Sequence, residues 1–298
     1  MPCQIVSPLN YTGGKSKLLD QILPYFPSEI DTFVDLFCGG CNVGLNVEAK
    51  KYILNDKNKM LIGLLKVMKA ENSFSEKVEK LIIKYNLSQS SNKGYKHYGC
   101  NSQDGLGKYN KAQYNNLRED FNKKLFDKND CYIALFVLIL YSFNNQIRFN
   151  SKGEFNLPVG KRDFNKKQKE KTSKYIESLR NKKITFSEKD FRKIHINSKS
   201  FVYCDPPYLI TTATYNENNG WNEKDENDLL SFLSALDEQN IKFALSNVLE
   251  HNGKKNIILS DWINKNGYNC YHLNKSYKNS SYNKKDKGQS DEVLITNY

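Results

Sequence analysis

The stretch Phe201-Val202-Tyr203-Cys204-Asp205-Pro206-Pro207-Tyr208 decides the fold. Its strand-forming residues run into a carboxylate, two prolines and an aromatic ring. Proline lacks an N–H donor and fixes φ, so a strand cannot continue through this point. The residue before each proline is also held extended. The sequence therefore predicts a rigid turn at the carboxyl end of a strand, where open α/β sheets bind their ligands.

Asp205, the Pro206 carbonyl and the Tyr208 ring suit a flat nitrogen base that carries an exocyclic amino group. Such a base would stack on Tyr208 and donate its two N–H bonds to Asp205 and Pro206. The alternative is an ordinary strand-to-loop corner in which Tyr208 only packs. These residues alone do not separate the two interpretations.

Length and composition set the class of protein. The 298 residues can form one large domain or two smaller ones. We expect a soluble, cytoplasmic protein, because no apolar signal segment opens the chain and the longest apolar segment, Cys131 to Tyr141, is too short to span a membrane.

The cysteines and the net charge give further expectations. Seven scattered cysteines do not form a disulfide framework, and Cys38-x-x-Cys41 has no second pair at metal spacing, so we expect no bound metal. The net charge of +12 favours a polyanionic partner such as nucleic acid. A coding bias that enriches lysine and asparagine is the alternative explanation of that charge.

The first segment contains a Gly13-Gly14 turn before Lys15, then an amphipathic helix that ends at prolines. A phosphate-binding loop would need glycine where Leu9 stands, which excludes the nucleotide triphosphatase interpretation. The turn is expected to place Tyr11 and Lys15 near a ligand.

The next segment predicts the first strand–loop–helix unit of a nucleotide-binding sheet. A buried strand, Thr32 to Leu36, precedes the glycine loop with Gly39 and Gly40, and a helix is expected after it. Asp35 at the strand end repels a pyrophosphate and attracts an ammonium. This favours S-adenosylmethionine over a nicotinamide dinucleotide.

Two further strands end in acids. Asp56 closes Tyr52 to Asp56, at a spacing that suits hydrogen bonds from ribose hydroxyls; a helix N-cap is the alternative. Asp190 closes a strand beginning at Ile184, where it would accept from the amino group of a cofactor adenine while Phe191 packs beside the ring. An exposed loop acid is the alternative for Asp190.

Residues 61–165 predict a separate helical domain inserted into the sheet domain, which comprises residues 1–60 and 166–298. The expected helices are Leu61 to Met68, Glu76 to Tyr85, Lys111 to Phe126 and Cys131 to Phe143, with a flexible loop from Ser88 to Lys111. The insertion ends in a predicted β-hairpin around Ser151-Lys152-Gly153. Its amides, arginine and aromatic rings suit a DNA groove, and Phe149 could fill the space left by a flipped base. A solvated surface hairpin is the alternative.

The last third of the chain completes the predicted sheet. A polar loop from Ile210 to Trp221 could close over a flipped base. An amphipathic helix is expected from Lys224 to Gln239 and a strand from Lys242 to Asn247. Two late strands, Tyr268 to Leu273 and Glu292 to Tyr298, suit a sheet that ends in an antiparallel pair.

These motifs, taken in order, resemble the Dam-like family of DNA adenine-N6 methyltransferases. The matching segments are Tyr-Thr-Gly-Gly-Lys, Asp-Leu-Phe-Cys-Gly-Gly, Leu-Asn-Asp, Arg-Phe-Asn-Ser-Lys-Gly-Glu-Phe-Asn-Leu-Pro-Val-Gly, Asp-Pro-Pro-Tyr, Leu-Ser-Asn and Glu-Val-Leu-Ile-Thr-Asn-Tyr. One departure is Cys41, where many relatives carry a third glycine.

The resemblance implies an α/β, Rossmann-like class I methyltransferase sheet with an inserted helical target-recognition domain. It implies double-stranded DNA as substrate, with a cognate restriction endonuclease as a candidate partner. The implied catalytic residues are Asp205, Pro206, Pro207 and Tyr208. The implied S-adenosylmethionine contacts are Tyr11, Gly13, Gly14, Lys15, Asp35, Leu36, Phe37, Gly39, Gly40, Asp56, Asp190, Phe191 and Asp205. The implied DNA contacts are Asn145, Arg148, Phe149, Asn150, Lys152, Asn156 and Pro158.

Other functions remain open from the sequence alone. Methylation of cytosine N4, or of adenine in RNA, uses similar amino-group chemistry. A DNA-binding module with a decayed methyltransferase fold is a candidate of another class, although the Asp205 motif is intact. A nicotinamide dehydrogenase is disfavoured by Asp35 and by the lack of a G-x-G-x-x-G motif.

Overall fold

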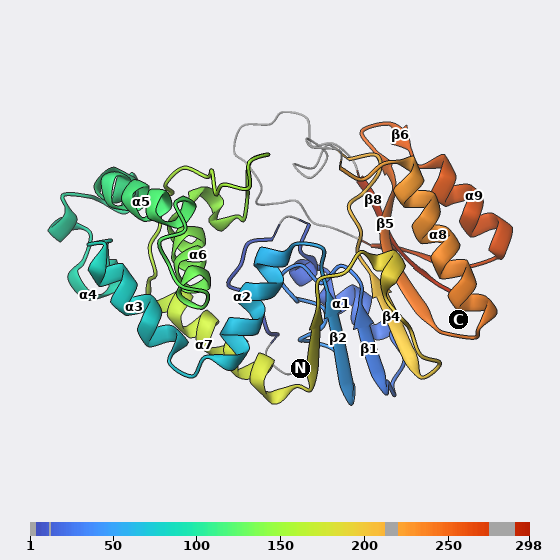
Figure 1. Ribbon diagram of the computed structural model, residues 1–298. Coiled ribbons are helices and arrows are strands. Elements are labelled where there is room, and N and C mark those ends of the chain that lie inside the picture. The colour runs from blue at the N-terminus through green and yellow to red at the C-terminus, as the bar shows by residue number, and fades with distance from the viewer. Residues whose placement is uncertain (1–3, 12, 212–219, 274–289) are drawn as a thin grey trace. The chain divides into compact units, whose positions relative to one another are not determined.

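The computed structural model describes residues 4–11, 13–211, 220–273 and 290–298. The chain forms two compact units, each made from two separate stretches of sequence. The helical unit contains Met1–Gly14 and Asn58–Lys182, and the sheet unit contains Lys15–Lys57 and Lys183–Tyr298. Figure 1 draws both, and each is described here by itself.

The boundaries of these units differ from the domain boundaries expected from the sequence. The first 14 residues and helix α7 (Lys166–Asn181) group with the helices rather than with the sheet. Helix α7 does so because it packs on helix α2 (Lys59–Ala70), where Lys69 donates hydrogen bonds to the Leu179 and Lys182 carbonyls. The basic composition of α7 suggested a solvated face, but its buried positions, Thr172, Tyr175, Ile176 and Leu179, recur at helical spacing.

The sheet unit is a mixed sheet with strand order β3-β2-β1-β4-β5-β8-β7, and β6 pairs with β5 beside this path. Strands β1 to β5 are parallel along that order, while β8 runs antiparallel to both β5 and β7. The expected parallel sheet with a late antiparallel pair is therefore confirmed. The strands are β1 Thr32–Asp35, β2 Lys51–Asn55, β3 Ile184–Ser187, β4 Ser200–Cys204, β5 Phe243–His251, β6 Lys254–Lys255, β7 Asn269–Leu273 and β8 Ser290–Thr296.

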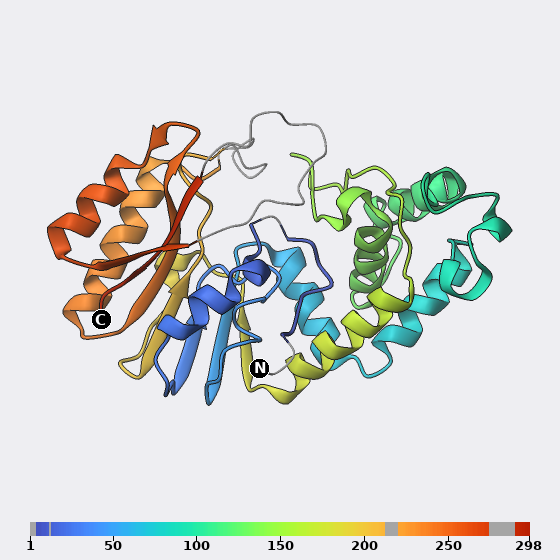
Figure 2. The same cartoon turned by 180° about the vertical axis from the view of Figure 1, so that it is seen from behind.

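Alternate residues of the central strands face opposite sides of the sheet, as the period of two requires. Val34 and Val202 share a buried cluster with the apolar stripes of helices α8 (Glu223–Glu238) and α9 (Ile257–Asn266). Phe33 and Phe201 point to the other side, where the Phe26 ring packs against both. Figures 1 and 2 show α8 and α9 on one face of the sheet and α1 (Leu19–Ile22) on the other.

Of the two helices expected at the amino end of the sheet unit, one is shorter than predicted and the other is replaced by turns. The helix predicted after Lys15 is limited to the single turn of α1, between the 3-10 turns η1 (Lys15–Lys17) and η2 (Leu23–Tyr25). The segment from residue 36 to residue 50, predicted as a glycine loop and a helix, consists of turns and bends. Gly44 lies against β2 in this segment: a β-carbon there would lie 2.7 Å from Leu54 Cδ2, so the close packing depends on glycine.

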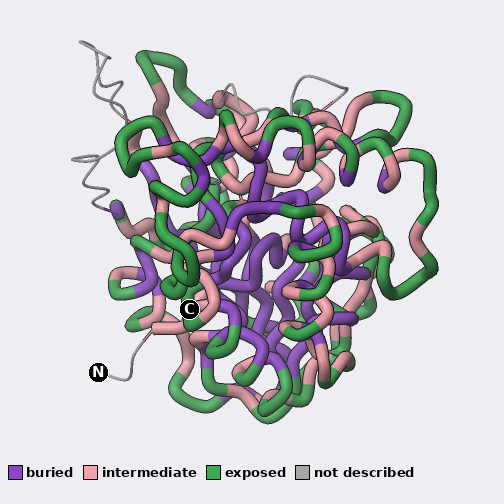
Figure 3. Tube along the Cα trace, turned by 90° about the vertical axis from the view of Figure 1, so that its left-hand side faces the viewer, coloured by how far each residue is buried: buried purple, intermediate pink, exposed green. Residues whose placement is uncertain are grey.

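The helical unit is built around helix α6, whose residues from Ile133 to Tyr141 are all buried. An all-round apolar helix must be central, and α6 contacts α2, α3 and α5. Gly63 of α2 is needed at this contact, since a β-carbon there would lie 2.2 Å from the Tyr132 ring. Figure 3 shows buried positions in the interior and exposed ones on outer turns. The remaining helices are α3 Phe74–Lys84, α4 Ser90–Lys93, η3 Lys96–Tyr98, α5 Gly107–Asn122 and η4 Phe143–Asn145.

Two sequence expectations for this unit need correction. The interval expected as a flexible loop, Ser88 to Lys111, contains α4, η3 and the first turn of α5, and Asp163 accepts hydrogen bonds from the Ser90 N–H (2.5 Å) and hydroxyl (2.9 Å). The predicted β-hairpin has no extended strands: two isolated antiparallel bridges, Phe149 to Phe155 and Ser142 to Val159, join its arms. In the part of the chain that the structure describes, no helix is both long and apolar enough to cross a membrane.

Candidate active site

The turn after β4 has the geometry that its prolines predict. Strand β4 is buried along its whole length, and its pairing with β5 ends at Cys204. Asp205 follows directly, with its side chain 17% exposed. Its Oδ1 accepts a hydrogen bond from the Tyr208 hydroxyl (3.1 Å), which closes the turn on itself. The acid and the ring are thus held together at the carboxyl end of a central strand.

Lys15 joins this turn from a distant part of the sequence. It is 2% exposed, and its Nζ lies 2.6 Å from Asp205 Oδ1 and 2.6 Å from the Tyr208 hydroxyl. The sequence predicted Lys15 as a cofactor contact, whereas the structure pairs it with the catalytic candidate. Burial raises the pKa of Asp205, while the charge and hydrogen bond of Lys15 oppose that rise.

A second carboxylate completes this group, and sequence reasoning gave it no role. Glu292 of β8 is 2% exposed, and its Oε1 lies 3.4 Å from Lys15 Nζ and 3.2 Å from the Tyr208 hydroxyl. The sequence showed it only as the first residue of the matching segment Glu-Val-Leu-Ile-Thr-Asn-Tyr, directly before an apolar run. We call Lys15, Asp205, Tyr208 and Glu292 the lysine cluster.

Asp35 lies at the end of β1, the strand next to β4, and is 2% exposed. Its Oδ1 is buried and has no hydrogen-bond partner within the described residues. Burial and the nearby charge of Asp205 raise the pKa of Asp35 well above its ordinary value. A buried acceptor without a donor is costly, so this oxygen is suited to a ligand that brings a positive charge.

The glycine loop is fixed by the ends of β1 and β2. The Gly39 N–H donates to Asp56 Oδ2 (3.0 Å), and the Asn55 side chain donates to the Leu36 and Lys189 carbonyls (3.0 Å each). Asp56 is not the N-cap of α2, because Asn58 accepts from the Leu61 N–H there. The ribose role of Asp56 remains a prediction. Asn55 was missed because a buried amide in a strand carries no motif.

Cys41, in the glycine loop, has a backbone conformation that is uncommon for residues other than glycine. Its φ is +57°, in the left-handed region that favours glycine. Cys38 and Cys41 are both free and buried, and both thiols lie near the Gly39 carbonyl. Gly40 is buried in the same turn.

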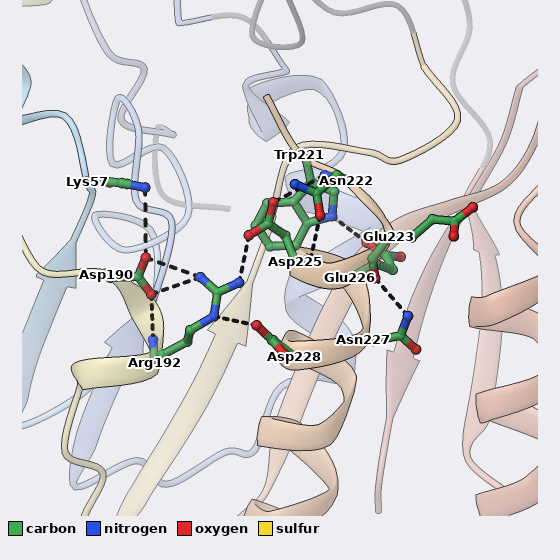
Figure 4. Close-up of polar contacts among 10 residues, drawn as sticks. All are labelled: Lys57, Asp190, Arg192, Trp221, Asn222, Glu223, Asp225, Glu226, Asn227 and Asp228. Carbon is green, nitrogen blue, oxygen red and sulfur yellow. Dashed lines mark hydrogen bonds and ion pairs between the residues drawn. The ribbon is translucent and has the colours of Figure 1, made fainter. Parts of the chain in front are cut away.

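Asp190 lies in a second charged group, drawn in Figure 4. Strand β3 ends at Ser187, so Asp190 is not the end of a strand but the N-cap of η5 (Phe191–Lys193). The Arg192 guanidinium lies 3.2 Å from both Asp190 oxygens and also reaches two acids of α8, Asp225 (2.6 Å) and Asp228 (2.8 Å). We call Asp190, Arg192, Asp225 and Asp228 the arginine cluster.

The arginine cluster lowers the pKa of Asp190 and is itself partly exposed. Burial would raise the pKa of Asp190, but hydrogen bonds and charge from Arg192 lower it below the ordinary value. Arg192 also lies over the Phe191 ring, 4.5 Å from its centre. Lys57 approaches the outer Asp190 oxygen at 3.8 Å.

Three aromatic rings meet beside the arginine cluster. Phe37, Phe191 and Trp221 have ring centres 5.5 to 5.8 Å apart in each pair. Trp221 is held by its indole N–H, which donates to the buried Glu226 (2.5 Å), visible in Figure 4. The sequence predicted Phe191 beside an adenine and assigned Trp221 to a loop. Most of that loop, residues 212–219, lies outside the described residues.

Three predicted cofactor contacts belong to the helical unit. Tyr11 is half-buried, and its carbonyl accepts from the Gly14 N–H (3.1 Å). Gly13 has φ +81°, a conformation that requires glycine in practice. Their cofactor role remains a prediction.

The predicted DNA contacts fall into two groups within the helical unit. Asn145 and Asn150 bond locally: Asn145 donates to the Ile139 and Leu140 carbonyls at the end of α6, and Asn150 accepts from the Lys152 and Glu154 N–H groups. The second group presents side chains outward. Arg148 is exposed and bonded to Asn156 Oδ1 (2.9 Å), Lys152 and Pro158 are exposed, and Phe149 packs edge-on against Phe155.

Within the described ranges, no three His, Cys, Asp or Glu side chains are placed to hold a metal ion. Asp205 and Glu292 lie beside the ammonium of Lys15 instead. The site therefore offers fixed carboxylates and aromatic rings as its chemical groups.

Comparison with known proteins supports the motifs. A family model described as D12 class N6 adenine-specific DNA methyltransferase matches residues 11–279. The chain is 44% identical to the type II methyltransferase M.FokI of Planomicrobium okeanokoites, over 99% of this chain and 43% of that protein. It is 38% identical to the modification methylase StsI of Streptococcus sanguinis, again over 99% of this chain and 43% of that protein.

The match to a third relative covers most of both proteins. The type II methyltransferase M.MjaIII of Methanocaldococcus jannaschii is 30% identical over 80% of this chain and 83% of that protein. By contrast, the chain spans less than half the length of M.FokI and StsI.

Proposed function

Because the chain belongs to the family of D12 class N6 adenine-specific DNA methyltransferases, we propose that it transfers a methyl group to N6 of an adenine in double-stranded DNA. The observation that supports this most directly is Asp205, a carboxylate held by Lys15 and Tyr208 at the end of β4. An exocyclic amine that must react through its lone pair needs such an acceptor in a fixed orientation.

The methyl donor in this proposal is S-adenosylmethionine, and the residues present suit it. Asp35 offers a buried, unpartnered oxygen to the ammonium of the methionine part. Asp56 would accept from the ribose, and Asp190 with Phe37, Phe191 and Trp221 would surround the adenine. When bound, the donor supplies an electrophilic methyl group on a sulfonium.

The turn after β4 would position the base. Asp205 and the Pro206 carbonyl accept the two N–H bonds of the amino group, which leaves the nitrogen lone pair directed away from the ring plane. The Tyr208 ring stacks on the base and restores part of the stacking lost when it leaves the duplex, about 1–3 kcal/mol. The turn is half-buried, with Pro206 buried, so bound base and cofactor would displace the remaining water from the reacting nitrogen.

The helical unit would bind the DNA, since N6 cannot be reached while the base is stacked. Arg148 and Lys152 are exposed at the turn formed by Ser151-Lys152-Gly153 in the helical unit, where they can meet phosphates or base edges. Phe149 would fill the space left by the flipped adenine. The expected cost of flipping is a few kcal/mol, which these contacts offset.

The same proposal extends to the biological setting. M.FokI is a type II methyltransferase and StsI a modification methylase, and their similarity to this chain suggests a role in a restriction–modification system with a cognate endonuclease. Such a system would act in the cytoplasm, beside the DNA it modifies.

The test is a nucleoside analysis of methylated DNA. Purified protein is incubated with S-adenosylmethionine and genomic DNA, and the digested nucleosides are separated by mass. The proposal predicts N6-methyladenine in the DNA and none in RNA. N4-methylcytosine, or methylation of RNA alone, would replace it with one of the related activities, and no product at all would contradict it.

A second experiment tests the flipping role of the hairpin. Duplex DNA with 2-aminopurine at the target position brightens when that base leaves the stack. Phe149→Ala is expected to reduce the fluorescence rise while leaving calorimetric binding of S-adenosylmethionine within about twofold, because Phe149 lies in the helical unit. An unchanged fluorescence rise would remove Phe149 from the proposal.

A further inference from the structure

Glu292 is a buried acid to which the proposed reaction assigns no task. It lies in the middle of a β-ladder, where its backbone pairs with Val248 of β5 and Leu273 of β7. Its side chain is 2% exposed and is followed by the apolar residues Val293 to Ile295. A buried carboxylate in such a strand is destabilising unless it is paired, so its presence calls for a physical reason.

The reason lies in the lysine cluster. Lys15 Nζ is 2.6 Å from Asp205 Oδ1 and 3.4 Å from Glu292 Oε1, so one ammonium lies between two carboxylates. The Tyr208 hydroxyl accepts from Lys15 and lies within donating distance of both acids, 3.1 Å from Asp205 and 3.2 Å from Glu292. We infer that Glu292 is a positioning residue for the proposed reaction: it shares Lys15 with Asp205 and orients Tyr208, so that Asp205 remains a strong acceptor for the amino group.

The electrostatic argument concerns what Lys15 would do with a single partner. An ammonium paired with Asp205 alone would draw the carboxylate's charge towards itself and compete with the adenine N–H bond for the same oxygens. A second carboxylate divides that attraction. Asp205 is then oriented by Lys15 without being neutralised by it.

The proton affinity of Asp205 responds accordingly. Burial raises the pKa of Asp205, Lys15 lowers it, and the charge of Glu292 raises it again. Removing the Glu292 charge should therefore lower this pKa and make Asp205 a weaker acceptor. The titratable groups that face Asp205 from the surrounding elements are Lys15 of η1, Asp35 of β1, Tyr203 of β4, Tyr208 of the turn and Glu292 of β8.

The hydroxyl contact gives Glu292 a second route to the reaction. Tyr208 is the ring expected to stack on the base, and its single hydroxyl proton lies within donating distance of Asp205 (3.1 Å) and of Glu292 (3.2 Å), which fixes the hydroxyl end of that ring. Lys15 also lies 5.0 Å from the centre of the ring. Loss of Glu292 would leave the ring tied to Asp205 and Lys15 only.

This inference rests on the proposed function, and its test uses Glu292→Gln, which keeps the shape and removes the charge. Single-turnover methylation is measured from acid to neutral pH, with S-adenosylmethionine binding followed by calorimetry. We expect the rate to fall about 10- to 100-fold while cofactor affinity stays within about threefold. The acid limb of the rate should move about 0.5–1 pH unit lower, because Asp205 protonates less readily.

Two further variants separate charge from packing. Asp291→Asn makes the same acid-to-amide change one position away, at a 39% exposed side chain bonded to His272, and is expected to react within about twofold of the parent. Glu292→Asp keeps the charge on a shorter side chain. It should lower the rate through the lost Tyr208 contact but leave the acid limb where it is in the parent.

Each outcome decides the question. A parental rate and acid limb in Glu292→Gln would overturn the inference and leave the proposed function intact, whereas a parent protein that methylates no adenine would overturn the function itself. An equal shift of the acid limb in Glu292→Asp and Glu292→Gln would assign the effect to loosened packing and also contradict the inference. If Glu292→Gln does not fold, a parental rate in Glu292→Asp contradicts it by itself.

Discussion

The sheet unit contains two charged groups of similar make-up in very different surroundings. In the lysine cluster, Lys15 is 1% exposed at its side chain and lies beside Asp205, which is 17% exposed, and Glu292, which is 2% exposed. In the arginine cluster, Arg192 is 33% exposed and lies among Asp190, Asp225 and Asp228, each 25 to 36% exposed. In each cluster one cation lies among two or more acids. One acid of each cluster follows the carboxyl end of a parallel strand: Asp205 follows β4, and Asp190 follows β3.

The difference in burial sets what each cluster can do. Buried charges interact strongly because water does not screen them, so small changes in the lysine cluster alter proton affinities. Exposed ion pairs contribute little, with a median of about 0–1 kcal/mol each, and salt weakens them further. We therefore expect the lysine cluster to control the rate and the arginine cluster to control the shape of the cofactor site.

The largest expected effect is at Asp205. Asp205→Ala should reduce methylation about 100- to 10 000-fold, because no other group accepts the adenine N–H bond in its place. DNA affinity, measured by fluorescence anisotropy, should remain close to that of the parent. The isosteric Asp205→Asn is the control for shape, and is expected to be nearly as inactive. Substantial methylation by either variant would remove Asp205 from the reaction.

Asp35 sharpens the comparison, since it is a buried acid without a cation of its own. Asp35→Asn should weaken S-adenosylmethionine binding about 10- to 100-fold, as expected for loss of a charge-assisted contact. Calorimetry measures this directly. Asp31→Asn is the control and should bind normally: Asp31 directly precedes β1, and its side chain contacts exposed Lys50 at 3.6 Å and accepts from the Thr32 hydroxyl at 3.3 Å.

We also expect Asp35→Asn to change the stability of the protein: it should weaken cofactor binding but stabilise the fold. The pKa of Asp35 is raised in the folded state, so its contribution to stability is present below the unfolded-state pKa and is lost as pH rises through the folded-state value. At pH 8, without cofactor, Asp35→Asn should therefore be more stable than the parent, by about 1–3 kcal/mol. The difference should vanish in acid. A less stable variant at pH 8 would show that the parent pairs this charge.

How far the sequence predicts this molecule depends on how local each signal is. The strand and turn at 201–208 were predictable because prolines and strand formers act on their own residues. The turns that replace a helix after Gly40 were not, because close packing of Gly44 on Leu54 is a tertiary effect. Lys15 was found through its motif, and its role as a cofactor contact remains a prediction; its contacts with Asp205 and Tyr208 were not predicted.

The two clusters show the same limit. Glu292 meets residues 15, 205 and 208 only after the sheet has formed, and no spacing in the sequence reports that contact. Arg192 is one of 45 lysine and arginine residues, so its contacts with α8 carry no signal in the sequence. Long-range pairing is what sequence patterns of periodicity and turns do not contain.

A substitution of Arg192 tests the role of the partly exposed arginine cluster. Arg192→Ala should weaken cofactor binding about three- to tenfold through a less ordered Asp190, and should lower the free energy of unfolding by about 1 kcal/mol at pH 7. The pKa of Asp190 is lowered in the fold, so this stability is present above the unfolded-state pKa and is lost as pH falls through the folded-state value. Parent and variant should thus converge below about pH 3.

Salt provides the control for that prediction. At 1 M NaCl the Debye length is about 3 Å, so the stability difference between Arg192→Ala and the parent should shrink. Arg192→Lys keeps the charge without the planar fork and is expected to fall between the two. A difference that persists unchanged at high salt would mean that packing over the Phe191 ring, not charge, is what Arg192 supplies.

The smallest expected effect is at Lys57, which lies at the outer edge of the arginine cluster. Its side chain is 84% exposed and its Nζ is 3.8 Å from Asp190 Oδ2, so solvent screens the pair. Lys57→Ala should leave cofactor affinity and rate within about twofold of the parent. A larger loss of affinity, seen by calorimetry at low salt and not in Lys50→Ala, would show that an exposed pair can also order Asp190. The contrast between the clusters would then rest on how the acids are arranged rather than on burial.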